Sequence, residues 1–126
     1  LEHATVHGNS YGTLKADIIE LLQAGKNVVM DIDVQGAASI RACEDAIIRR
    51  CYADVYIHVP AAALEARLRG RQTDSEEVIA LRLHNAAAED ARMGEYEYVL
   101  VSGDRESDYA RFNSLLSALS MRTALR

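Results

Sequence analysis

The sequence has no apolar run long enough to cross a membrane. None of its apolar runs approaches about 18 consecutive residues, and its first residues lack the basic start and apolar stretch of a secretory signal peptide. We therefore expect a cytoplasmic protein without membrane contact. Cysteine is also scarce: only Cys43 and Cys51 occur, and their spacing fits neither CxxC nor a Cys/His metal site, which predicts reduced, half-buried thiols.

An excess of positive charge is absent as well. The formal net charge is −5, whereas proteins that bind nucleic acids generally carry a basic face. This charge argues against a nucleic-acid partner. The basic residues are nevertheless unevenly distributed, because several arginines gather between positions 67 and 82.

Linkers and repeats are missing too. Pro60 is the only proline, and no segment is rich in proline, glycine or serine, so no internal domain boundary is visible. With 126 residues, of which 49% are hydrophobic, the chain is expected to form one compact domain.

Helical patterns recur along the chain. Apolar spacing and end signals predict helices over 13–25, 37–43, 61–70 and 73–93. Thr13 is the expected N-cap of the first helix and Gly25 its end, while Thr73 and Glu76 are spaced as a capping box. A last helix is marked by a stripe of apolar residues, namely Phe112, Leu115, Leu116 and Leu119.

Three strands are expected between these helices. Residues 27–33, "NVVMDID", form an uninterrupted apolar run typical of a strand covered on both faces, and residues 52–59 and 96–101 are rich in β-branched and aromatic side chains. Strands that alternate with helices pair in parallel through right-handed crossovers. The sequence thus predicts an α/β fold built on a parallel sheet.

Asp31 and Asp33 stand at the carboxyl end of the first expected strand. Ligands of open parallel α/β sheets bind beyond the carboxyl ends of the strands, and residues two apart on a strand point to the same side. Two carboxylates on one side repel each other unless cations or ligand donors lie between them. The alternative is that both are solvated turn residues or caps of the following helix.

The opening segment, "LEHATVHGNSYGT", has the composition of a binding loop. It holds Glu2, Tyr11 and Thr13 around two glycines, which permit close approach of the backbone to a ligand. Its apolar content is too low for us to expect a helix or strand there. An ordinary surface loop is the alternative interpretation.

Three motifs together resemble those of one family. "LEHATVHGNSYGT", "VVMDIDVQG" and "EARLRGRQTDSEEVIALRL" occur in the order and spacing of guanylate kinases, and the resemblance covers almost the whole chain. It implies a P-loop kinase-like fold of three strands, flanking helices and a helical lid. It also implies transfer of a phosphoryl group from ATP to GMP or dGMP, with Mg²⁺ as cofactor.

The resemblance also implies roles for individual residues. Glu2 matches the glutamate that reads guanine, since a carboxylate accepts from both N1–H and the exocyclic amine. The expected GMP-binding residues are Glu2, Tyr11, Gly12, Thr13 and Asp33.

The expected catalytic residues are Asp31, which would organise Mg²⁺-bound water or phosphate, and the lid residues Arg67, Arg71 and Arg82. Guanidinium groups grip phosphate oxygens two at a time, and Arg67 and Arg71 would also contact ATP. No residue is assigned as a direct metal ligand. Arg69 is interpreted instead as a surface residue paired with Glu65.

The chain departs from the family pattern at several positions. Ser10 replaces a common aromatic residue, Gln72 stands where a lid glycine is usual, and "VLVSGD" replaces "VxVNDD", which puts Ser102 where an asparagine lies beside the adenine of ATP.

The P-loop motif G-x-x-x-x-G-K-[ST] is the largest departure, because it does not occur in these residues. We therefore expect residues 1–126 to be the C-terminal part of a guanylate-kinase-like domain, with 1–14 from the GMP-binding segment and 67–94 as the lid. Alone, they should not catalyse the reaction, and through an unpaired sheet edge they should associate with themselves or with the missing N-terminal part. The alternative function is a catalytically inactive module that binds phosphorylated partners.

Overall fold

The computed structural model describes residues 3–6, 9–12 and 15–122, with side chains described from residue 15 onward. Its contacts divide the chain into two compact units, the first ending at Ala53 and the second running from Asp54 to Arg122. Within the described part of the chain, no helix has the length and apolar character that a membrane span requires.

The first unit begins with an antiparallel hairpin where a loop was predicted. Strand β1 (His3–Val6) pairs with β2 (Asn9–Gly12), and Ala4 lies opposite Tyr11. The prediction was wrong because it relied on apolar content, whereas backbone hydrogen bonds and β-favouring residues such as Thr5 and Val6 are sufficient for a short strand pair.

Three short helices complete this unit. Helix α1 (Lys15–Gln23) ends before Gly25, which has the left-handed φ of 78° predicted for it. Helix α2 (Val34–Arg41) begins earlier than expected, and α3 (Ala46–Cys51) was not predicted. One side chain from each helix forms the core: Ile18, Ile40 and Ile48.

Residues 27–33 do not form the predicted strand. Their burial alternates instead: Val28, Met30 and Ile32 pack against the isoleucine core, whereas Val29 is 65% exposed. A fully buried strand needs a hydrogen-bonded neighbour and cover on both faces, and this segment pairs with no strand of the described residues. The apolar run therefore serves as a one-sided packing segment.

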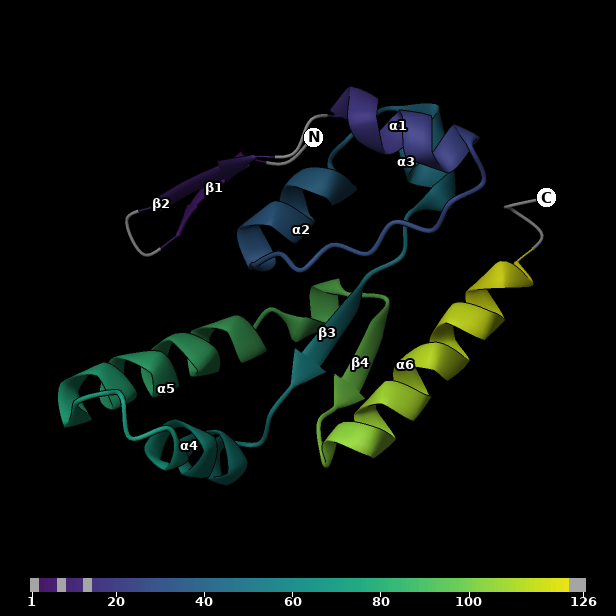
Figure 1. The fold of residues 1–126 in the computed structure, drawn as a ribbon. Coiled ribbons are helices and arrows are strands. Elements are labelled where there is room, and N and C mark those ends of the chain that lie inside the picture. The colour runs from purple at the N-terminus through teal and green to yellow at the C-terminus, as the bar shows by residue number, and fades with distance from the viewer. Residues whose placement is uncertain (1–2, 7–8, 13–14, 123–126) are drawn as a thin grey trace. The chain divides into compact units, whose positions relative to one another are not determined.

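The second unit contains the predicted parallel pair. Strand β3 (Val55–His58) lies beside β4 (Tyr98–Val101), with Tyr56 opposite Val99 (Figure 1). Both strands fall within the predicted ranges, and the α/β class is confirmed. The backbone N–H of Ser102 donates to the carbonyl of His58 at 2.8 Å, which extends the pairing past the end of β4.

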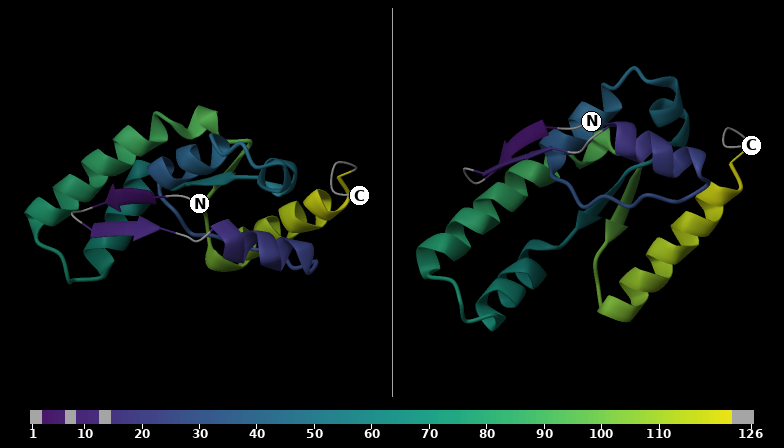
Figure 2. Two further views of the ribbon diagram at one scale, coloured as in Figure 1. Left: turned by 90° about the horizontal axis from the view of Figure 1, so that it is seen from above. Right: turned by 45° about the horizontal axis from the view of Figure 1, so that its top comes forward.

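Two helices in a hairpin connect the strands. Helix α4 (Ala61–Gly70) and α5 (Glu76–Asp90) lie side by side, and the 3₁₀ helix η1 (Met93–Glu95) leads into β4 (Figures 1 and 2). The predicted capping box is wrong: the Ser75 side chain, not that of Thr73, caps α5 by accepting from the Val78 N–H at 3.2 Å.

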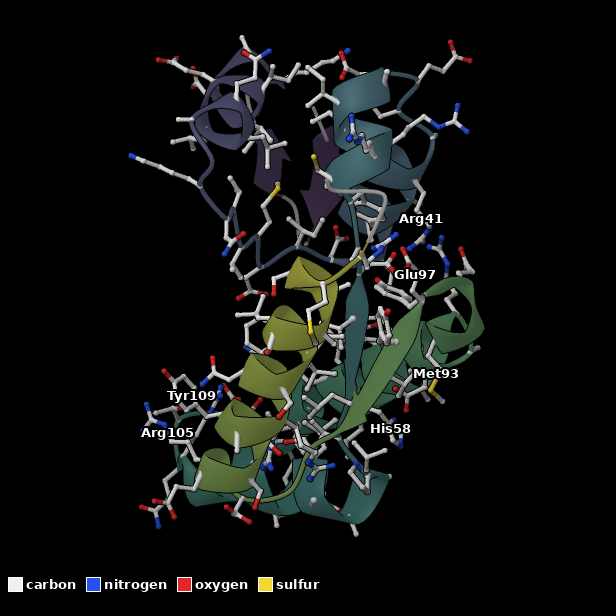
Figure 3. The ribbon with its side chains drawn as sticks, turned by 90° about the vertical axis from the view of Figure 1, so that its right-hand side faces the viewer. Arg41, His58, Met93, Glu97, Arg105 and Tyr109 are labelled. Atoms are coloured by element: carbon white, nitrogen blue, oxygen red, sulfur yellow. The ribbon has the colours of Figure 1, made fainter. Side chains whose placement is uncertain are left out.

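Helix α6 (Arg105–Ser120) closes the second unit. It contacts β4, and the predicted stripe of Phe112, Leu115, Leu116 and Leu119 is half-buried. Arg105 and Tyr109 of the same helix are exposed, and Figure 3 shows them extending from α6 away from strands β3 and β4. The Asp104 carboxylate caps the helix by accepting from the Ser107 N–H at 2.9 Å.

Candidate functional site

The predicted site residues fall into two groups, one in each unit. Asp31 and Asp33 belong to the first unit, together with Tyr11 and Gly12 of β2, while the arginines belong to the second. In the first unit, β1 lies against α2, so the hairpin is close to the helix that Asp33 caps (Figure 1). Glu2 and Thr13 lie outside the described residues.

Asp33 is the N-cap of α2. Its Oδ1 accepts from the Gly36 N–H at 2.9 Å. A Cβ at Gly36 would lie 3.2 Å from the Cβ of Ile32 and 3.3 Å from Asp33 Oδ1, so glycine permits this close turn. The cap occupies Oδ1 with a structural hydrogen bond, as the alternative interpretation of this residue expected. Oδ2 has no hydrogen-bond partner among the side chains that the structure describes.

Asp31 differs from Asp33 although it is only two residues away. Its side chain is exposed and makes no hydrogen bond or ion pair with any other described residue. An exposed carboxylate to which no described side chain donates a hydrogen bond suits a cation or bound water.

Arg67 is anchored by one of its nitrogens. Its Nη2 donates to the Gly103 carbonyl at 2.8 Å and to Ser102 Oγ at 3.2 Å. Both acceptors follow β4, so they join α4 to the carboxyl end of that strand. Nη1 and Nε have no partner among the residues that the structure describes, which leaves three N–H donors for a ligand.

Asp108 supports the same acceptors from α6. Its Oδ2 accepts the Ser102 hydroxyl proton at 2.6 Å, and its Oδ1 accepts the Gly103 N–H at 2.8 Å. The bond from Gly103, followed by that from Ser102, lowers the pKa of the Asp108 carboxyl. The charges of Arg111 and Arg67 lower this pKa to a smaller extent. The carboxylate therefore stays ionised around neutral pH.

Arg71, Arg82 and Arg69 have different surroundings. Arg71 is the exposed C-cap of α4 and makes no side-chain bond to another described residue. Arg82 of α5 has its Nε 3.5 Å from Asp74 Oδ2. Arg69 pairs with Glu65 at 3.0 Å and with Glu76, which confirms its interpretation as an ion-paired surface residue.

The second unit contains another polar cluster, which no pattern in the sequence predicted. The Tyr56 hydroxyl donates to Asp90 Oδ1 at 2.6 Å, and His58 Nδ1 lies 3.2 Å from the same oxygen. Burial, followed by the bond to Asp90, raises the pKa of Tyr56. Tyr56 and Asp90 are 34 positions apart, so no local spacing could have predicted the pair.

The described side chains do not form a metal site of their own. Among the described residues, no group of three or more His, Cys, Asp or Glu side chains could hold a metal ion. Mg²⁺ usually keeps several waters and binds through one or two carboxylates together with substrate phosphates. A single exposed carboxylate such as Asp31 fits an ion that arrives with a nucleotide.

Comparison with known proteins gives a consistent result. The family model described as guanylate kinase matches residues 1–119. A guanylate kinase of Anaeromyxobacter dehalogenans is 44% identical over 126 residues, which cover 99% of this chain and 54% of that protein. One from Salmonella typhimurium is 41% identical over 97% of this chain and 57% of its own length.

A solved structure is similar as well. The crystal structure of guanylate kinase from Anaplasma phagocytophilum matches 98% of this chain and 57% of its own, with a TM-score of 0.77 and 29% identity. The chain thus spans little more than half the length of the relatives that it matches.

Proposed function

Since this chain belongs to the guanylate kinase family, we propose that its full-length gene product transfers a phosphoryl group from ATP to GMP or dGMP. The observation that carries the proposal is the set of arginines on the α4–α5 hairpin. Arg67 keeps three N–H donors without a described partner, Arg71 has no described partner at all, and Arg82 is held only loosely by Asp74.

Such arginines suit phosphoryl transfer. The transferring group carries negative charge on several oxygens, and catalysis depends mainly on positioning and on neutralising that charge. In our proposal, Arg67 and Arg71 contact ATP, and Arg82 joins them around the transferring group. Residues 67–94 act as the lid that brings the three together, and closing such a lid excludes water.

The residues that we assign to GMP, the phosphoryl acceptor, belong to the first unit. We assign Glu2 and Asp33 to the guanine base, Tyr11 to the GMP phosphate, and Gly12 and Thr13 to the same binding segment. Two observations agree with this assignment: α2, which Asp33 caps, contacts β1, and Asp33 Oδ2 has no partner among the described side chains. Asp31 would hold water bound to Mg²⁺, which enters with ATP and neutralises phosphate charge.

Residues 1–126 on their own are proposed to self-associate. Both strands of the parallel pair have exposed apolar side chains, namely Ile57, Tyr98, Val99 and Val101, and each strand has an unpaired edge within the described residues. Size-exclusion chromatography with light scattering should give a mass above 13.9 kDa for the chain. A monomer at micromolar concentration would refute this proposal.

The reaction is tested on the full-length gene product. With ATP and Mg²⁺, GMP should give GDP, whereas AMP should react far more slowly. Glu2→Gln should lose the preference for GMP over AMP by about 100-fold or more, because the amide presents an N–H to guanine where an acceptor is needed. A full-length protein that binds GMP but forms no GDP would instead support the inactive binding module.

The lid assignment is tested by a matched pair of variants. Arg71→Ala should lower kcat more than it raises the KM for GMP, since its charge acts on the closed, reacting complex. Arg69→Ala changes the arginine two residues earlier, in the last turn of α4, and should leave kcat nearly unchanged because Arg69 is paired with Glu65 and Glu76. An equal loss of kcat in Arg71→Ala and Arg69→Ala would contradict the proposed role of Arg71.

A further inference from the structure

The end of β4 carries a hydrogen-bond relay that the family resemblance does not assign. It begins at Asp108 on α6, passes through the Ser102 hydroxyl and the Gly103 peptide, and ends at Nη2 of Arg67 on α4. We propose that Asp108 is a positioning residue that fixes the Arg67 guanidinium for the ATP phosphates. This inference rests on the proposed function, because it needs Arg67 to contact ATP.

The directions of the hydrogen bonds support the relay. A serine hydroxyl has one proton and two lone pairs. Since the Ser102 proton goes to Asp108 at 2.6 Å, its lone pairs face the Arg67 N–H at 3.2 Å. Without Asp108 the hydroxyl could rotate, and its oxygen would no longer be held as an acceptor for Arg67.

The second branch of the relay acts through the backbone. Asp108 Oδ1 holds the Gly103 N–H at 2.8 Å, and the carbonyl of the same residue accepts from Arg67 at 2.8 Å. The Ser102 N–H is itself bound to the His58 carbonyl, so one end of this segment is already fixed by the sheet. Asp108 fixes the other end.

Burial and charge agree with a positioning role. Ser102 is only 8% exposed and is the one buried polar residue among those that the structure describes. Asp108 does not bond to Arg67 directly, so it does not consume the donors that a phosphate would use. An anchored guanidinium with free N–H groups binds an anion with less loss of side-chain entropy than a mobile one.

Asp108→Ala in the full-length gene product tests the inference. We expect the KM for ATP to rise about 5- to 10-fold, the scale of one or two lost hydrogen bonds, while the KM for GMP changes less than 2-fold. Asp108→Asn retains one suitable hydrogen-bond acceptor, so its KM for ATP should lie between those of wild type and Asp108→Ala. The matched control is Glu106→Ala, which removes an acid from the same first turn of α6 but touches no part of the relay.

A double-mutant cycle separates positioning from general damage. If Asp108 acts through Arg67, Asp108→Ala should have no further effect on the KM for ATP in an Arg67→Ala background. Ser102→Ala provides a second variant should Asp108→Ala fold poorly, and it should also raise the KM for ATP.

The possible failures are distinguishable. If Arg67→Ala leaves the KM for ATP unchanged, the proposed role of Arg67 is itself wrong. If Arg67→Ala raises that KM but Asp108→Ala does not, or if Asp108→Ala has the same effect in both backgrounds, only the positioning role is overturned.

Discussion

Different kinds of contact stabilise the interior of each of the two units of this chain. The first has an apolar core of three isoleucines, around which residues such as Met30 and Ile32 pack. The second also buries apolar side chains, namely Tyr56, Leu68, Ile79 and Leu100, one on each of four elements. It adds polar links between distant segments, such as Tyr56 with Asp90 and Arg67 with Ser102, which are 34 and 35 positions apart.

This difference shows how each unit depends on its individual residues. Apolar packing is non-directional and tolerates substitutions that keep the volume. A hydrogen bond between buried or half-buried groups needs a particular donor and a particular acceptor, and loss of either leaves the other unsatisfied. We therefore expect single changes to affect the units through different mechanisms. Hydrogen exchange of the full-length gene product, followed by mass spectrometry, reports each unit separately.

Ile40→Ala should have the largest effect and should weaken the first unit. Ile40 is 4% exposed, and replacing such a side chain by alanine costs about 3 kcal/mol through lost burial and a new cavity. Exchange should accelerate in α1–α3 far more than in β3 and β4. Val29→Ala is the matched control, because Val29 is 65% exposed, and a comparable loss there would contradict the observed one-sided packing of residues 27–33.

Tyr56→Phe should weaken the second unit by about 2 kcal/mol, since it removes a hydrogen bond to a carboxylate. It should also change the response to alkali. The raised pKa of Tyr56 means that above about pH 10 the unfolded chain loses this proton while the folded chain keeps it, so stability falls as pH rises.

Denaturant unfolding between pH 8 and 11 checks this expectation, and Tyr56→Phe should flatten the alkaline loss. Tyr109→Phe is the control, because Tyr109 is 69% exposed and points away from the sheet (Figure 3). An unchanged alkaline slope in Tyr56→Phe would contradict the role of the Tyr56–Asp90 bond.

Gln72→Gly should stabilise the second unit modestly. Gln72 has a φ of 56°, a left-handed conformation that costs a residue with a Cβ about 1 kcal/mol relative to glycine. Thermal unfolding should show a small rise in Tm, whereas Gln72→Ala should give none. A lower Tm for the glycine variant would mean that the greater freedom of the unfolded chain outweighs the relieved strain.

Asp45→Asn should have the smallest effect and should appear only in acid. Hydrogen bonds from Ile48 and Ile47 N–H groups to Asp45 at the start of α3 lower its pKa. Its stabilising contribution is therefore present above the unfolded pKa of about 3.9 and is lost as pH falls through the folded value.

Asparagine caps a helix about as well as aspartate does, so the two proteins should match at pH 7. Below about pH 4, wild type should lose more stability in the first unit than the Asn variant does. If both proteins lose the same amount of stability as the pH falls, the ionised Asp45 carboxylate does not stabilise α3 as proposed.

The sequence predicted most of the second unit and less of the first. The helices over 61–70 and 73–93, the two flanking strands and their parallel pairing all followed from periodicity and β-branched content. Residues 27–33 were predicted wrongly because an apolar run does not reveal whether a neighbouring strand is available to pair with it.

The candidate site was predictable only where a motif is local. Arg67, Arg71 and Arg82 stand close together in the sequence and remain on one helical hairpin. Asp108 and Asp90 were missed because their partners are brought to them by tertiary structure, and no spacing rule covers contacts of that range. Ser102 was noticed only as a departure from a pattern, although its hydroxyl is the centre of the relay.

The most direct test of the account is hydrogen exchange of the full-length gene product with and without nucleotides. With GMP, ATP and Mg²⁺ together, we predict slower exchange in both units, at the start of α2 around Asp33 and across the α4–α5 hairpin. GMP alone should slow exchange only in the first unit. Unchanged exchange around Asp33 with GMP bound, or across the α4–α5 hairpin with both nucleotides bound, would contradict the nucleotide-binding roles proposed for these residues.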